Sequence, residues 1–239
     1  MNDQPIKIAI LDSVPKFHWR DDNGVTDGQK FVDLLAPENV NAKFDIFYVS
    51  EYEFPDIIES YDGYLLTGSP VSVHDNHDWI KILSEFVGQA DNKNKPIVGV
   101  CFGHQLIAKY YGGVVGNNEK GWMIGSFPLE IKKKFPWMKN ALDTTDLYHF
   151  NKERVTKLPK GAISFASTKD YPDFAYTLGN NIACLQGHPE QPKRAMYNFL
   201  EVTKKVLTEQ EFEKAKQRIE NGKSDSSVWA QWIMEFFCS

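Results

Sequence analysis

The segment around Cys101 places a cysteine between two glycines, Gly99-Val100-Cys101-Phe102-Gly103, directly after the apolar run Ile97–Val100. A strand that leads through Gly-x-nucleophile-x-Gly into a helix holds the nucleophile at the tip of a sharp turn, where glycines avoid side-chain clashes. The helix N-terminus favours a thiolate there, and the N–H of Phe102 is placed to stabilise an oxyanion. Cys101 is therefore a candidate nucleophile, although a buried thiol packed between two glycines would show the same motif.

A cysteine nucleophile needs a base, and Gln186-Gly187-His188-Pro189-Glu190 supplies a candidate at the end of another apolar run. Catalytic groups gather at the C-terminal ends of strands in open α/β sheets. Glu190 can accept a hydrogen bond from the His188 ring and so fix its tautomer and orientation. The alternative is a surface loop with a turn-forming proline.

Two other polar segments are also candidates for a functional role. The run His74-Asp75-Asn76-His77-Asp78 contains ligand types that suit a divalent metal. We favour a polar loop in which Asp75 or Asp78 caps the helix that follows, and we expect no metal or cofactor. His18, within Phe17–Arg20, is interpreted as a surface residue, with the rim of a pocket as the alternative.

The composition excludes several classes of protein. The chain has 239 residues, is 42% hydrophobic and 25% charged, and carries 27 basic and 32 acidic residues, a net charge of −5. This is an ordinary globular profile, and an acidic chain without a basic tract argues against nucleic-acid binding. Cys101, Cys184 and Cys238 are too scattered for a disulfide framework or structural zinc, so reduced thiols and a cytoplasmic location are expected. No signal peptide or membrane-spanning run is visible, so no membrane partner is expected.

The candidate residues must be positioned by strands and helices that alternate through the first half of the chain. Continuous apolar strands separated by helices predict parallel strands covered on both faces. The expected strands are Ile6–Leu11, Phe44–Val49, Gly63–Thr67 and Ile97–Val100, and the expected helices are Gln29–Leu35, Asp78–Gln89 and His104–Tyr111.

The second half of the chain has a different sequence pattern. Between Val114 and Gln186, short runs separated by turn signals predict hairpins added to the same sheet. The expected strands are Phe127–Ile131, Ile163–Ala166, Phe174–Leu178 and Ile182–Gln186, followed by helices at Arg194–Val206, Glu209–Ile219 and Ser227–Phe237. The fold class is thus a three-layer α/β sandwich with a mainly parallel central sheet and a helical C-terminal tail.

Together, Gly-Val-Cys-Phe-Gly-His-Gln at 99–105 and Gly-His-Pro-Glu at 187–190 resemble the class I glutamine amidotransferase family. The spacing of 87 positions from Cys101 to His188 fits that family, and the resemblance runs from Ile6 to about Val206. It implies a catalytic triad of Cys101, His188 and Glu190 on a flavodoxin-like fold.

The resemblance extends to the groups expected around the triad. Gly68-Ser69-Pro70 is similar to the family's oxyanion loop, so the implied oxyanion hole is formed by Gly68, Ser69 and Phe102. Gln105 matches the glutamine of the family's C-x-G-x-Q, which helps to hold the substrate.

Within the family, the chain looks most like stand-alone members. It resembles both the glutaminase domain of GMP synthase and the plant γ-glutamyl peptidases. Thr67–Pro70 and Asp78-Trp79 resemble the former, and Glu209–Phe212 with Trp229 resembles the tail of the latter. The likeness implies a catalytic domain at 1–206 and a helical extension at 207–239 packed on it.

The implied function is amide hydrolysis. Cys101 would attack the γ-amide of glutamine or a γ-glutamyl compound, form a γ-glutamyl thioester, and release ammonia or an amine. Three alternatives stay open: a γ-glutamyl peptidase acting on glutathione-like conjugates, a binding or regulatory homologue of low activity, and a subunit that passes ammonia to a separate synthase.

Two positions depart from the family pattern and bear on substrate identity. Asn151 stands where many relatives carry the histidine of His-x-Asp-x-Val, and His149 lies two residues earlier. Met123 stands where relatives often carry a glutamate, which removes a carboxylate near the expected pocket. Trp122 is expected to border the site.

Overall fold

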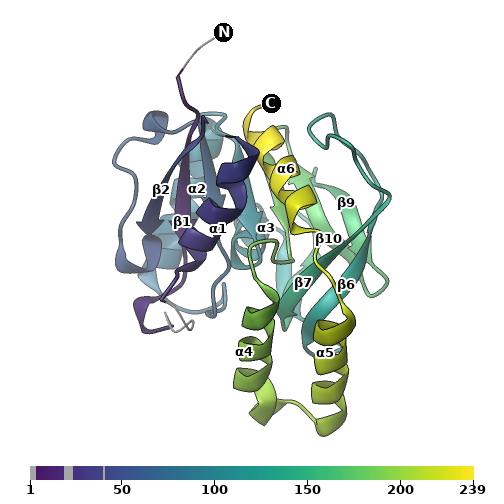
Figure 1. Cartoon of the computed structure of the whole chain (residues 1–239). Helices are drawn as coiled ribbons and strands as arrows, with labels where there is room; N and C mark the ends of the chain where they lie inside the picture. Colours follow the sequence, from purple (N-terminus) through teal and green to yellow (C-terminus); the bar gives the residue numbers. More distant parts are fainter. Residues whose placement is uncertain (1–3, 19–23, 40) are drawn as a thin grey trace.

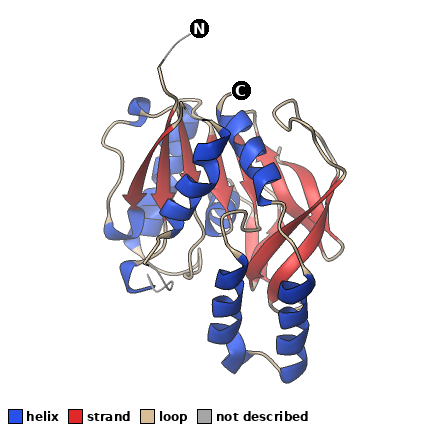
Figure 2. Cartoon of the chain, in the orientation of Figure 1, coloured by secondary structure: helices blue, strands red, loops and turns tan. Residues whose placement is uncertain are grey.

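The computed structural model describes residues 4–18, 24–39 and 41–239. Its centre is a sheet in the order β2-β1-β3-β4-β11-β10-β9-β6-β7 (Figures 1 and 2). The first five strands in this order are parallel to one another. They are β2 (Lys43–Tyr48), β1 (Lys7–Asp12), β3 (Gly63–Leu66), β4 (Ile97–Val100) and β11 (Ile182–Leu185). The apolar runs predicted these strands, because strands buried on both faces need continuous apolar sequence.

The other half of the sheet is antiparallel. It contains β10 (Tyr171–Leu178), β9 (Ile163–Thr168), β6 (Met123–Ile131) and β7 (Thr144–Asn151). A separate antiparallel pair joins β5 (Val114–Asn117) to β8 (Glu153–Lys157). The sequence analysis did not identify β5, β7 or β8. In β7 the buried positions include the polar residues Thr145, His149 and Asn151, so the strand lacks the apolar alternation of a half-buried strand.

Helices cover both faces of the parallel half (Figure 1). On one face lie α1 (Asp27–Leu35) and α6 (Ser226–Phe237), and on the other lie α2 (Asp78–Asn92) and α3 (Phe102–Tyr110). The structure therefore has the three layers that the sequence predicts. Short 3-10 turns lie at Lys16–His18, Ala36–Glu38, Val49–Glu51, Ile58–Ser60 and Lys204–Val206.

The last helix is part of the core. Trp229 and Trp232 of α6 are buried, and their indole N–H groups donate to Thr145 Oγ1 at 3.1 Å and to the Lys139 carbonyl at 3.0 Å. Phe237 packs so closely on β3 that a Cβ at Gly63 would lie 2.5 Å from its ring. The parallel sheet is thus closed on one face by residues from the far end of the chain.

A helical hairpin extends beyond the sheet (Figure 1). It consists of α4 (Lys193–Thr203) and α5 (Glu209–Asn221), which pack on β6 through a small core of their own. A capping box starts α5, since Thr208 accepts from the Glu211 N–H and Glu211 accepts from the Thr208 N–H.

The start of α2 differs from the prediction. His77 occupies the N-cap without a side-chain hydrogen bond, and Asp75 instead accepts from the Ser72 N–H at 2.9 Å. Asp78 pairs with Lys81 at 3.2 Å, so neither aspartate caps the helix, and that expectation was wrong. Over the described ranges, no cluster of three or more His, Cys, Asp or Glu side chains has the arrangement of a metal site.

Of the helices in the described part of the chain, none is long and apolar enough to cross a bilayer.

Candidate functional site

Cys101 stands at the junction of β4 and α3, in a backbone conformation that side chains rarely adopt. It is the N-cap of α3 with φ 49° and ψ −99°. Holding a non-glycine residue at positive φ costs of the order of 1–3 kcal/mol, and such strain collects at functional sites. The glycines at positions 99 and 103 are required by close packing: a Cβ would lie 2.9 Å from the Gly103 carbonyl carbon in one case and 2.6 Å from Leu66 Cβ in the other. The residue with the positive φ in this turn is the cysteine itself.

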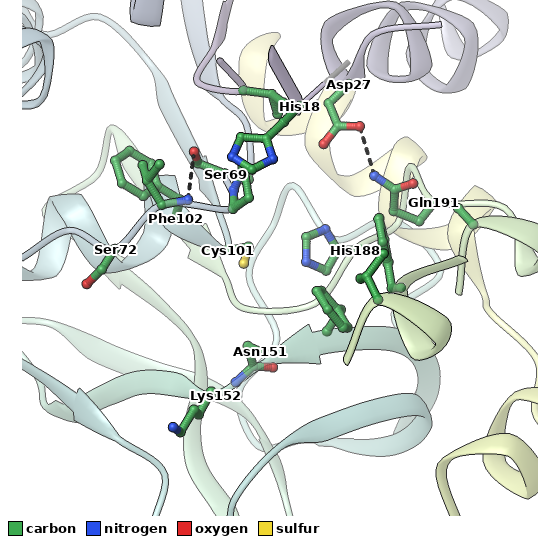
Figure 3. A pocket seen from close by; sticks show the side chains of 18 of the residues that line it. His18, Asp27, Ser69, Ser72, Cys101, Phe102, Asn151, Lys152, His188 and Gln191 are labelled. Atoms are coloured by element: carbon green, nitrogen blue, oxygen red, sulfur yellow. Dashed lines mark hydrogen bonds between the residues drawn. The ribbon is translucent and has the colours of Figure 1, made fainter. Parts of the chain in front are cut away.

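His188 follows β11 and lies beside Cys101 (Figure 3). A Cβ built on Gly68 would touch both, at 3.0 Å from His188 Cε1 and 3.6 Å from Cys101 Cβ. The main-chain N–H of His188 donates to the Tyr148 carbonyl at 2.8 Å, which ties the site to β7. The base thus follows a parallel strand, as the nucleophile does, and is also held by a bond to the antiparallel half of the sheet.

Glu190 completes the arrangement. Its Oε1 lies 2.7 Å from Nδ1 of His188, and both side chains are buried. Burial lowers the pKa of His188, but the charges of Glu190 and Cys101 outweigh it and raise the pKa well above the ordinary 6.5. Within the described structure, Nε2 of His188 has no hydrogen-bond partner of its own. The three residues singled out from the sequence therefore lie together, and the negative charges beside the imidazole favour its protonated form.

The loop after β3 supplies main-chain donors near the cysteine. Thr67 Oγ1 accepts from the Ser13 N–H at 2.9 Å, and Ser69 Oγ donates to the Ser13 carbonyl at 2.7 Å, which anchors the loop to the end of β1. Among the described residues, none accepts a hydrogen bond from the main-chain N–H of Gly68, Ser69 or Phe102. These are the groups that the sequence resemblance proposes for an oxyanion hole.

Gln105, on the first turns of α3, lies in the pocket wall. Its Nε2 donates to the Glu153 carbonyl at 2.9 Å and to Gln186 Oε1 at 3.0 Å. Tyr171 donates to the same Gln186 oxygen at 3.1 Å. The amide protons of Gln105 thus hold the wall together, a role that the sequence did not indicate.

The site opens into a pocket of about 940 Å³ that extends to both sides of Cys101 (Figure 3). One side carries Asp27 and Gln191, and the other carries Asn151 and Lys152. Lys30 also lines the pocket and contacts both Asp27 and Gln191. Aromatic and aliphatic side chains also line the pocket, among them Phe17, Val25, Trp122, Phe150, Phe199 and Val202. Trp122 borders the site as expected.

The residues after β1 were the main omission from the sequence analysis. His18 is exposed, as interpreted, and it also lines the pocket, which agrees with the alternative, while Trp19 and Arg20 lie outside the described residues. Asp27 and Lys30 were not singled out. Their place after a parallel strand was an available signal, since such loops meet at the same sheet edge as the one that carries Cys101.

The two departures from the family pattern lie opposite each other across β6 and β7, where Met123 pairs with Asn151. Asn151 lines the pocket, and its Nδ2 donates to the Glu153 carbonyl at 3.1 Å. Met123 is 6% exposed and lies outside the lining, next to Trp122. Of the two positions, Asn151 is the one that can touch a substrate directly.

Two further histidines are buried near the site without polar partners in the described chain. His104 packs 4.9 Å from the Tyr176 ring and His149 packs 4.7 Å from the Phe174 ring, measured between ring centroids. Burial lowers the pKa of each to about 3, so both are neutral. Cys184 is similarly inert, because burial in β11 raises its pKa to about 12. His188 differs from the other two by its carboxylate and thiol neighbours.

Comparison with known proteins identifies the family to which the chain is similar. The family model described as glutamine amidotransferase class-I matches residues 29–204. Gamma-glutamyl peptidase 3 of Arabidopsis thaliana is 30% identical over 216 residues, covering 86% of each chain. The glutamine-hydrolysing GMP synthase of Wolbachia pipientis is 27% identical over 85% of this chain, which spans 42% of that protein. A glutamine amidotransferase structure from Thermotoga maritima has the same fold, with a TM-score of 0.76 at 18% identity, covering 98% of this chain and 96% of the other.

Proposed function

Since the chain belongs to the class I glutamine amidotransferase family, we propose that it hydrolyses the γ-amide bond of glutamine or of a γ-glutamyl compound. The observation that carries the proposal is the strained Cys101 at a helix N-terminus beside His188, whose ring is paired with Glu190 at 2.7 Å. Cys101 is the nucleophile, His188 is the general base and acid, and Glu190 orients His188.

The reaction begins with proton transfer from Cys101 to Nε2 of His188. The raised pKa of His188 favours an imidazolium beside the sulfur, and the resulting thiolate attacks the γ-carbonyl carbon. The carbonyl oxygen becomes an oxyanion, stabilised by the N–H groups of Gly68, Ser69 and Phe102. One such donor contributes about 3 kcal/mol in serine hydrolases.

The tetrahedral intermediate then collapses. The C–N bond breaks as His188 gives its proton to the departing nitrogen, so ammonia or an amine leaves and a γ-glutamyl thioester remains on Cys101. His188 next takes a proton from a water molecule, which attacks the thioester, and glutamate leaves as the thiol is restored. Each step uses side chains, main-chain N–H groups and water.

The pocket favours a leaving group larger than ammonia. Its volume of about 940 Å³ lies near the upper end of the range for small-molecule sites and exceeds what one amino acid requires. A γ-glutamyl peptide would place its glutamyl part on one side of Cys101 and its amine part on the other. The similarity to gamma-glutamyl peptidase 3 supports this second candidate.

The proposed catalytic domain is residues 1–206, with 207–239 as a helical extension on it. The match to a GMP synthase supports a further alternative, in which ammonia passes to a separate synthase subunit. A binding or regulatory homologue would keep the fold and turn over neither substrate class.

A substrate panel tests the proposal. Ammonia release from glutamine and amine release from γ-glutamyl dipeptides are measured for the wild type, for Cys101→Ala and for a control, Cys238→Ala, at an exposed thiol. We expect Cys101→Ala to abolish turnover and Cys238→Ala to retain it. Turnover that survives in Cys101→Ala would contradict the proposal.

The products of the same panel distinguish the alternatives. Amine release without ammonia release indicates a peptidase. No turnover of either class by the wild type, with or without a synthase partner, indicates a binding homologue.

A further inference from the structure

The side chain of Gln191 joins the first turns of α1 to the proposed triad. Its Nε2 donates to Asp27 Oδ1 at 3.0 Å and to Glu190 Oε1 at 3.1 Å, and its Oε1 accepts from Lys30 Nζ at 3.3 Å. Figure 3 shows the bond between Gln191 and Asp27 above His188. Gln191 is 3% exposed, so these contacts are made in a nearly dry environment.

These contacts fix how the amide is turned. The two carboxylate oxygens require the NH₂ group on their side, and the lysine requires the carbonyl oxygen on the other. A flipped amide would point its oxygen at two carboxylates and its NH₂ at a cation. The orientation of Gln191 is therefore determined by three charged groups.

The same contacts restrain Glu190. Its Oε1 accepts from both His188 Nδ1, at 2.7 Å, and Gln191 Nε2, while its Oε2 is buried without a partner among the described residues. A carboxylate held by a single donor can swing about its side-chain torsions. Two donors converging on one oxygen restrict that motion, and Glu190 in turn sets the plane of the His188 ring.

The anchor of Gln191 is itself rigid. Asp27 and Lys30 form an ion pair at 2.9 Å, with side chains only 17% and 11% exposed. The carboxylate of Asp12 holds the start of α1 on β1, because its two oxygens accept from the Gly28 N–H at 2.8 Å and the Val14 N–H at 3.0 Å. The chain of contacts thus runs from a buried strand end to the base of the triad.

We propose that Gln191 is a positioning residue that, anchored by Asp27 and Lys30, holds Glu190 so that His188 keeps its Nε2 toward Cys101. This inference rests on the proposed function in taking Cys101 and His188 as nucleophile and base. The charged or titratable groups around the contact are Asp12, Asp27 and Lys30 on the α1 side and Cys101, His149 and His188 on the other.

The test measures alkylation of Cys101 by iodoacetamide as a function of pH, read by peptide mass spectrometry, because this reaction needs no substrate. Gln191→Leu removes all three side-chain hydrogen bonds of Gln191 at similar volume. Loss of orientation at Glu190 weakens the support for the His188 imidazolium, so the pH of half-maximal alkylation moves up. We expect the rate at pH 6 to fall about tenfold.

Two further variants bracket that result. Lys30→Met leaves Gln191 in place but removes one anchor, and we expect a smaller fall, about threefold. Gln29→Leu, on the exposed side of α1, removes a similar amide–carboxylate bond to Asp33 at 2.8 Å and should leave the profile unchanged. Lys30→Met also keeps the proposal testable if Gln191→Leu does not fold, which thermal unfolding would reveal.

The outcomes separate this inference from the proposed function. If the wild-type Cys101 is rapidly alkylated at pH 6 and the profile is the same in Gln191→Leu and Lys30→Met, the positioning role is overturned alone. If wild-type Cys101 reacts no faster at pH 6 than Cys238, both are overturned. With an active substrate, Gln191→Leu should lower kcat about tenfold and leave KM unchanged.

Discussion

The pocket has two walls, which differ in how closely their residues are packed. The catalytic wall consists of the strand ends that carry Gly68, Cys101 and His188, where a single added Cβ would meet its neighbours at 3.0 Å or less around Gly68, Gly99 and Gly103. The outer wall consists of Trp122, Phe150, Asn151, Lys152, Phe199 and Val202, from the residue before β6, from β7, from the turn after β7 and from α4. Val202 in the outer wall is 74% exposed. In the proposed reaction, close backbone packing would therefore fix the chemistry, whereas side chains with room to vary would contact the substrate.

The largest effect should come from the catalytic wall. His188→Asn removes the proton acceptor while keeping a polar side chain, and we expect kcat to fall by at least about 10⁴-fold, by analogy with other nucleophile–histidine hydrolases. The matched control is His74→Asn, whose ring bonds the Val115 carbonyl outside the pocket lining. Steady-state kinetics on the substrate found in the panel would measure both. Equal losses in the two variants would show that the loss at His188 is not specific to the catalytic wall.

A smaller change tests close packing directly. Gly68→Ala adds a Cβ that lies 3.0 Å from His188 Cε1, so the ring must move by a few tenths of an ångström. A misplacement of about 1 Å lowers kcat by about 100-fold, so for this smaller shift we expect a fall of about tenfold. Gly116→Ala is the control, since its nearest contact is an ordinary 3.7 Å. An unaltered kcat in Gly68→Ala would show that the catalytic wall tolerates more than its geometry implies.

Each wall has a buried neutral histidine next to it. His104 lies behind the catalytic wall, and His149 lies on β7, which contributes to the outer wall. Each has a pKa lowered to about 3 in the folded chain, against about 6.5 when unfolded, so the unfolded chain binds more protons between these values. Stability is therefore lost as pH falls below about 6.5, by about 1.4 kcal/mol per histidine at pH 5.5. Urea unfolding at pH 7.5 and 5.5 measures the difference.

His104→Met would isolate one of these contributions. Its packing volume is similar and it cannot be protonated, so the loss of stability between pH 7.5 and 5.5 should shrink by about 1.4 kcal/mol. His188 contributes with the opposite sign, because its raised pKa adds stability below about 6.5 that disappears as pH rises through the folded value. An unchanged pH dependence in His104→Met would mean that this ring is protonated in the folded chain.

The smallest effect is expected in the outer wall. The Phe199 ring stacks on Phe150 at 4.7 Å between centroids. Phe199→Ala removes apolar surface from the pocket without touching Cys101, so KM for γ-glutamyl-phenylalanine should rise about fivefold while kcat stays within twofold. The KM for glutamine, which is too small to need that surface, is the control. A fall in kcat instead of a rise in KM would place Phe199 functionally in the catalytic wall.

The sequence predicted the catalytic wall better than the outer wall. Cys101, with its flanking glycines, and the segment from His188 to Glu190 are local patterns, since each lies within a few residues at the end of one apolar strand. Their meeting follows from parallel strands, whose C-terminal ends share one edge of the sheet. Local pattern and topology together were sufficient to predict that these three residues lie close to one another.

The outer wall and the Gln191 contacts depend on pairings that no local pattern reveals. The bond from Gln191 to Asp27 joins residues 164 positions apart, and β7 turns the polar residues His149 and Asn151 inward, against the usual alternation. The α2 cap was mispredicted for a similar reason: Asp75 had a competing donor at Ser72, which the sequence does not rank above the helix.

The place of α6 has a consequence for the synthesis of the chain. Phe237 packs on Gly63 of β3, yet it is added 174 residues later. At roughly 5–20 residues per second, this is a delay of about 10–35 s. Throughout that interval the apolar face of β1 and β3 lacks one of its two covering helices, and the nascent chain presents it to any other protein nearby.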